Sequence, residues 1–240
     1  MNSKIKIGLF SLFFCFFYFS FAEDSIITTS ASNSEDTVLV QKHKILKKYP
    51  PHFDSLENRF VLRNEMAPYG RKVLRGMGLS FASQGMSTAL LLVVPADFSN
   101  WKVHSYRENF KNAYTKPPVI DHDVWYINYI GHPYQGSWYY NAYRSQGAKW
   151  WQSALFSFGH STFWEYLIES GFERPSVQDL IVTPVIGSLL GELFHFSTMK
   201  MSKNGFKWYE ATFVSLFNPM FAINNGFKRF NVQSKKNIAY

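Results

Sequence analysis

Cysteine is nearly absent from this sequence: among its 240 residues only Cys15 carries a thiol. Cys15 lies in an N-terminal apolar segment that we predict to be cleaved, so the mature chain is expected to contain no cysteine. Disulfide bonds, thiolate catalysis and cysteine-based zinc sites are thereby excluded. The sequence also lacks G-x-S-x-G, P-loop and H-E-x-x-H patterns, so none of these enzyme templates applies.

Residues 1–22 have the order of a secretory signal peptide. Lys4 and Lys6 precede an almost wholly apolar run at 7–19, and Ser20-Phe21-Ala22 then supplies small residues for cleavage. A retained anchor helix is the alternative, but the run is shorter than the roughly 20 apolar residues that a span needs. We expect an exported protein, in the periplasm or outer membrane.

The chain is basic, with a formal net charge of +8. Its Lys and Arg residues gather at 42–48, 200–207 and 228–236, on either side of an apolar middle region. They do not cluster with stacking aromatic residues, so we predict no nucleic-acid partner. Basic runs beside apolar helices are solvated or contact anionic lipid. Membrane lipid is therefore the expected partner, and the sequence identifies no protein partner.

Hydrophobic runs interrupted by Pro and Gly predict an all-α fold, a bundle of about five to six apolar helices with kinked segments. Residues 23–62 are expected to be a disordered or irregular lead-in with a short helix after Pro51, 63–220 the helical domain, and 221–240 a basic tail. The polar segment 97–118 is predicted to be a connection. The helices are expected at 73–94, from about 121 through a break at Pro133 to Gly147, and then at 149–170, 176–200 and 208–217.

Several side chains stand out on the predicted helices. After the break at His132-Pro133, Tyr139 and Arg144 follow on one helix, and with Tyr140 and Trp164 they are candidates for substrate binding. An aromatic packing face with satisfied hydroxyls is the preferred alternative. Four residues are predicted to be structural: glycines that allow close helix approach, and an aspartate in a capping box after Ser176. These are Gly136, Gly187, Gly191 and Asp179.

The candidate catalytic residues are histidines and glutamates in the apolar middle of the chain. Glu192 and His195 are three residues apart and can converge, as in carboxylate-bridged metal sites of helical bundles. Glu165 and Glu169 are like charges one helical turn apart, and we expect Glu169 to be solvated and Glu165 to be functional. The catalytic candidates are His132, Glu165, Glu192 and His195. A divalent metal at such residues is weighed against a buried hydrogen-bonded network without metal, which is preferred.

An ordered set of short motifs runs through the middle of the chain. Its members are His132-Pro133, Gly136, Tyr139-Tyr140-Asn141-Ala142, Arg144-Ser145, Trp164-Glu165-Tyr166, Pro175-Ser176, Asp179-Leu180, Gly187 and Gly191-Glu192. Over about 120–200 this string resembles domain-of-unknown-function family 3943. The resemblance implies an exported, outer-membrane-associated protein of Gram-negative bacteria with no established activity. His160 stands where the family pattern leads us to expect a small residue.

Two function classes are left open by these observations. The first is a non-enzymatic helical envelope protein, associated with a membrane, with a structural or lipid-contacting role. The second is a hydrolase or transferase acting on an envelope lipid or glycan, with His132 or His195 as base and Glu165 or Glu192 as its partner. A metal-binding module without catalysis is a third alternative.

Overall fold

The computed structural model describes residues 52–54, 59–93, 101, 105–120, 124–203 and 205–227. The predicted signal peptide, most of the predicted lead-in and the tail from 228 lie outside these residues. The described part is all-α apart from one short antiparallel pair and an isolated parallel bridge between Val119 and Ser176. In that pair β1 (His52–Asp54) lies against β2 (Arg59–Val61), with Phe53 opposite Phe60. The short helix predicted after Pro51 is therefore wrong, because these residues form a strand.

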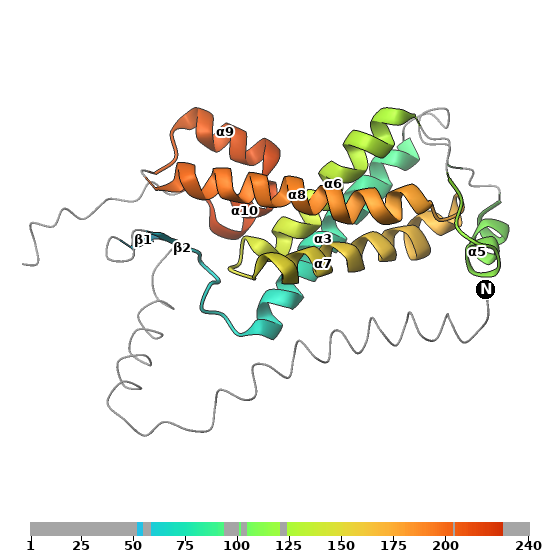
Figure 1. The fold of residues 1–240 in the computed structure, drawn as a ribbon, viewed down its shortest axis with the longest axis horizontal. Helices are drawn as coiled ribbons and strands as arrows, with labels where there is room; N and C mark the ends of the chain where they lie inside the picture. Colours follow the sequence, from blue (N-terminus) through green and yellow to red (C-terminus); the bar gives the residue numbers. More distant parts are fainter. Residues whose placement is uncertain are drawn as a thin grey trace, which may run out of the picture.

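Four helices form the main bundle: α3 (Tyr69–Val93), α6 (His132–Arg144), α7 (Trp150–Phe163) and α8 (Val177–Ser202). The short helix α6 is central and packs against the other three. At one end of the bundle lie α9 (Trp208–Phe217) and α10 (Pro219–Asn225), and α5 (Tyr106–Thr115) lies at the other end (Figure 1). Helix α5 corrects the prediction of a plain connection at 97–118.

Two π-helical segments alter the path of the chain beside the bundle. One segment, Ile127–Gly131, leads into α6, which begins at His132-Pro133 because proline lacks the N–H that a first helical turn leaves unused. The other, Trp164–Ile168, extends α7 and passes into a short 3₁₀ turn, Glu169–Gly171. A π-helical turn holds an extra residue, so side chains beyond it change face relative to a regular α-helix.

The helices α6 and α8 approach each other most closely where Gly136 of α6 meets Gly187 of α8. A Cβ on Gly187 would lie 2.7 Å from the Gly136 Cα and 3.0 Å from the Pro133 carbonyl oxygen. Further along α8, a Cβ on Gly191 would lie 2.6 Å from the Tyr140 ring. The predicted structural role of Gly136, Gly187 and Gly191 thus matches their positions, because only glycine leaves room for this contact.

In α7 and α8 polarity is the reverse of that in a typical water-soluble protein, whereas the central helix α6 buries Tyr139, Tyr140 and Tyr143. The buried residues of α7 and α8 are small, polar or ionisable: Ser153, Ser157, Gly159, His160 and Ser161 in α7, and Asp179, Thr183, Pro184, Gly187, Gly191, His195, Thr198 and Ser202 in α8. The outward face of α8 carries large apolar side chains, among them Ile181, Leu189 and Phe196, which are 57%, 66% and 65% exposed. Helices α3 and α8 are both long and apolar enough to cross a membrane, by length and composition.

Candidate functional site

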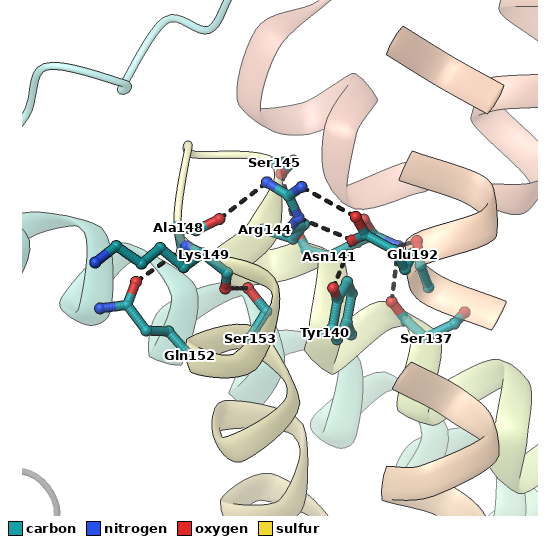
Figure 2. A network of polar contacts seen from close by, with 11 residues as sticks. Ser137, Tyr140, Asn141, Arg144, Ser145, Ala148, Lys149, Gln152, Ser153 and Glu192 are labelled. Carbon is teal, nitrogen blue, oxygen red and sulfur yellow. Dashed lines mark hydrogen bonds and ion pairs between the residues drawn. The ribbon is translucent and has the colours of Figure 1, made fainter. Parts of the chain in front are cut away.

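The first polar cluster joins α6 to α8 through Arg144 and Glu192 (Figure 2). The Arg144 guanidinium donates to both Glu192 carboxylate oxygens, at 2.8 and 3.0 Å, and to the Ala148 carbonyl oxygen at 2.9 Å. The Tyr140 hydroxyl donates to the same carboxylate at 2.5 Å. Burial, and then the hydrogen bond to Glu192, raises the pKa of Tyr140. Arg144, Tyr140 and Glu192 therefore bind one another, which fastens the C-terminal end of α6 to α8.

The second polar cluster consists of His132, Glu165 and Asp179, which come from three different elements. Each offers one ligating atom, and these atoms all lie within 4.8 Å of one another. The His132 Nδ1 is 3.8 Å from the Asp179 Oδ1 and 3.2 Å from the Thr183 hydroxyl. All three residues are buried, with exposed fractions of 7%, 1% and 4% in that order. We call this set the histidine–carboxylate cluster.

Glu165 is positioned by the start of α8. Its Oε2 accepts the Ser176 backbone N–H at 2.8 Å, while the Ser176 hydroxyl accepts the Asp179 N–H at 3.1 Å. Burial, together with repulsion from Glu169 and Asp179, holds the pKa of Glu165 well above its usual range. The predicted cap at Ser176 is confirmed, but the acid that accepts the Ser176 N–H is Glu165, eleven residues earlier in the chain.

Glu169 and Trp164 are both buried and are hydrogen-bonded to each other. Glu169 is 6% exposed, so the prediction of a solvated carboxylate is wrong. Its two oxygens accept indole N–H groups from Trp101 at 3.2 Å and from Trp164 at 2.6 Å. Trp101 in turn stacks on Phe172 at a ring-centroid distance of 4.0 Å. Trp164, predicted to bind substrate, is buried and is used to hold Glu169 in place.

The three histidines of the apolar middle region do not meet. His132 belongs to the histidine–carboxylate cluster, and His195 is buried on α8 with no hydrogen-bond partner for its Nδ1 in the described part of the chain. His160 packs among the rings of Phe81, Tyr139 and Phe156. The predicted catalytic set is therefore divided: His132 and Glu165 lie together, whereas Glu192 is bound by Arg144.

Burial, and to a lesser extent the nearby Glu169 and Glu165 carboxyl groups, raises the pKa of the Tyr139 hydroxyl. This hydroxyl accepts a hydrogen bond from the Gln135 side chain at 2.5 Å, and the Tyr139 side chain is fully buried. Glu192 instead bonds to Tyr140, the next residue, which points to a different side of α6. Asp179 is the member of the site that sequence reasoning missed, because its place in a capping box gave it a sufficient local explanation.

Burial of His160 leads to a prediction about pH. Transfer of this ring into the bundle lowers its pKa to about 3. In the unfolded chain a histidine titrates near a pKa of about 6.5, so the unfolded state binds more protons between these values. The stabilisation is complete above the unfolded pKa and falls by up to about 1.4 kcal/mol per pH unit as pH drops toward 3.

The measurement compares wild type with His160→Gln, which cannot titrate, in detergent at pH 7.5 and pH 5.5. The difference in unfolding free energy between the two proteins is expected to shift in favour of the variant by about 1.4 kcal/mol at the lower pH. Other titrating groups cancel in this difference. An unchanged difference at the two pH values would show that His160 does not stay neutral in the fold.

Comparison with protein-family models gives one match, to a domain of unknown function, DUF3943, over residues 117–220. The similarity to this family is thus shown for residues 117–220, which are less than half of the chain. The match is wider than the resemblance noted at 120–200, and it includes every residue of both polar clusters. Neither the curated proteins nor the solved structures compared with the chain gave a match. The DUF3943 segment includes α6, α7, α8 and α9 but not α3.

Proposed function

We propose that this protein is an exported envelope protein whose helical bundle contacts membrane lipid in a structural or lipid-contacting role. The observation that carries the proposal is the reversed polarity of α7 and α8. Large apolar side chains point outward from α8 and small polar ones point inward. In water, each Å² of exposed apolar surface costs about 25 cal/mol relative to burial, and soluble monomers rarely expose large apolar patches. In lipid the same arrangement is favourable, because polar groups then find their partners inside.

Helix α3 supports the same proposal. Its exposed residues include Leu74, Leu90 and Val93, at 70%, 64% and 84%, whereas its buried residues include Ser80, Ser83 and Gln84. The Gln84 side chain donates to the His160 carbonyl oxygen at 3.0 Å, so its amide is used inside the bundle. The predicted signal peptide and the basic runs add support for export and for contact with anionic lipid.

The positions and contacts of the candidate catalytic residues support the enzymatic alternative less well. The histidine–carboxylate cluster has a general-base composition, with an imidazole beside two carboxylates. However, its three residues are almost fully buried, which closes the cluster to a lipid or glycan head group in this conformation. The Glu192 carboxylate, the other proposed partner of a base, is occupied by Arg144 and Tyr140.

The membrane proposal predicts how the full chain fractionates. Wild type is expected to stay with membranes after an alkaline carbonate wash. Leu189→Lys places a charge on the apolar face of α8, at a cost of about 3 kcal/mol in the middle of a bilayer, and is expected to lower the retained fraction. Met66→Lys is the matched control, because Met66 is exposed but precedes α3. It should fractionate like wild type.

Intact mass measured on the same samples shows whether residues 1–22 are still present, since a retained segment would anchor the chain by itself. Two results would contradict the proposal. One is complete release of processed wild type by the wash. The other is equal retention of Leu189→Lys and wild type when residues 1–22 are absent from both.

A further inference from the structure

We propose that the histidine–carboxylate cluster, formed by His132, Glu165 and Asp179, binds one divalent transition-metal ion. One imidazole nitrogen and two carboxylate oxygens are a competent ligand set for Zn²⁺ or Mn²⁺. The three side chains come from the first turn of α6, the π-helical segment after α7, and the first turn of α8. Their ligating atoms lie within 4.8 Å of one another, and so they need only small side-chain rotations to reach a common ion.

One buried oxygen of Glu165 lacks a hydrogen-bond donor among the described residues, and this favours a bound ligand. Glu165 is 1% exposed, and its Oε2 is held by the Ser176 N–H, but its Oε1 has no hydrogen-bond donor among the residues that the structure describes. A charged carboxylate oxygen without a donor is unfavourable at a buried site, so without an ion the Glu165 carboxyl group keeps a proton, consistent with its raised pKa and its side-chain hydrogen bond with Glu169. A bound cation supplies the missing interaction.

The start of α8 brings Glu165 and Asp179 together at the Ser176 cap, where the Ser176 N–H donates to Glu165 and the Asp179 N–H donates to the Ser176 hydroxyl. In a complete capping box the acid at the third helical position accepts the backbone N–H of the cap residue. Here Glu165 accepts the Ser176 N–H instead, at 2.8 Å, and the Asp179 carboxylate lies 3.8 Å from the His132 ring. Two acidic side chains, Glu165 and Asp179, therefore lie at the Ser176 cap, although a capping box uses only one.

The surroundings have the parts that orient metal ligands. The Ser176 N–H fixes Glu165 in place. The Thr183 hydroxyl lies 3.2 Å from the His132 Nδ1, so it orients the ring when Nε2 holds the ion, and an ion at Nδ1 would have to displace it. Glu169 is close enough to raise the pKa of Glu165, but both of its oxygens accept indole N–H groups. It adds negative charge next to the cluster without competing as a ligand, and a divalent cation offsets the repulsion among the three carboxylates.

The test uses the purified full chain in detergent, stripped with a chelator and then given Zn²⁺ or Mn²⁺ alone. We expect about one ion bound per chain, by elemental analysis after desalting, and a higher unfolding temperature with the ion than without it. Loss of an outer-shell partner weakens metal sites about 10–100-fold, so Glu165→Gln and Asp179→Asn, which each remove a ligand, should weaken binding at least tenfold. Glu108→Gln, at an exposed carboxylate in α5, is the control and should bind like wild type.

Circular dichroism of each variant shows whether the helices are retained, so a folded variant that loses the ion supports the site. Wild-type chain with native helix content that binds neither ion overturns the proposal, whatever the variants do. Binding that Glu108→Gln weakens as much as Glu165→Gln does also overturns it. The proposal does not depend on membrane contact, because the ion-binding assay is independent of how the chain fractionates.

Discussion

Gly136→Ala is expected to destabilise the protein by about 3 kcal/mol, at the upper end of the range for overpacked cores. The added Cβ would overlap the Thr183 carbonyl oxygen and would lie 2.9 Å from its carbonyl carbon and 3.2 Å from the Gly187 Cα. These are backbone atoms of α8, which cannot rotate aside as a side chain can. Relief of the overlap therefore requires α6 and α8 to separate.

Separation of the two helices would also lengthen polar contacts farther along α6. The Asn141 side chain donates to the Gly191 carbonyl oxygen at 3.0 Å, and the Arg144–Glu192 ion pair lies one turn beyond it (Figure 2). Both contacts depend on the spacing of the helices that Gly136 and Gly187 allow. The stability loss should consequently exceed that of an ordinary glycine-to-alanine change.

The measurement is the free energy of unfolding, or the unfolding temperature, in detergent. Gly85→Ala in α3 is the matched control, because a Cβ there would meet nothing within 4 Å. At that position alanine favours the helix over glycine by up to about 1 kcal/mol, so the control should be as stable as wild type or slightly more stable. Equal stability of Gly136→Ala and Gly85→Ala would contradict the close approach of α6 and α8.

Glu192→Leu is expected to cost about 2 kcal/mol of stability. It leaves the Arg144 guanidinium, whose side chain is 22% exposed, without the carboxylate that accepts two of its hydrogen bonds, and it leaves the Tyr140 hydroxyl without its acceptor. Loss of one partner of a fully buried pair costs about 3–5 kcal/mol. The Glu192 side chain is 41% exposed, so solvent lowers that figure.

A double-mutant cycle with Arg144→Met isolates the ion pair from other effects of each substitution. The double variant should lose less stability than the sum of the two single variants, by about 1 kcal/mol, because neither charge is then left unpaired. Tyr140→Phe, which removes only the hydroxyl, should cost less than Glu192→Leu. Strict additivity of Arg144→Met and Glu192→Leu would show that the pair contributes no coupling between α6 and α8.

Local patterns in the sequence predicted the features that depend on neighbouring residues. Proline at the second residue of α6, the Ser176 cap of α8 and the glycine contact face all follow from backbone chemistry within one or two turns. The same reasoning gave the all-α class, because hydrophobic runs of helical length are visible along the chain. It failed for α5, whose polar and aromatic composition is typical of a connection as well as of a short helix.

The sequence by itself thus determined the all-α class, the main helices of the bundle, the close-contact glycines and the similarity of residues 117–220 to DUF3943. The tertiary structure decided which ionisable groups meet. It placed Asp179 with His132 and Glu165, and it paired Glu192 with Arg144. It also buried Glu169, whose carboxylate accepts two indole N–H groups. The reason is geometric. Which side chains converge depends on how α6 and α8 cross and on the π-helical turn at Trp164–Ile168, which brings both Glu165 and Glu169 to buried positions. Neither is encoded in the spacing of residues along one helix.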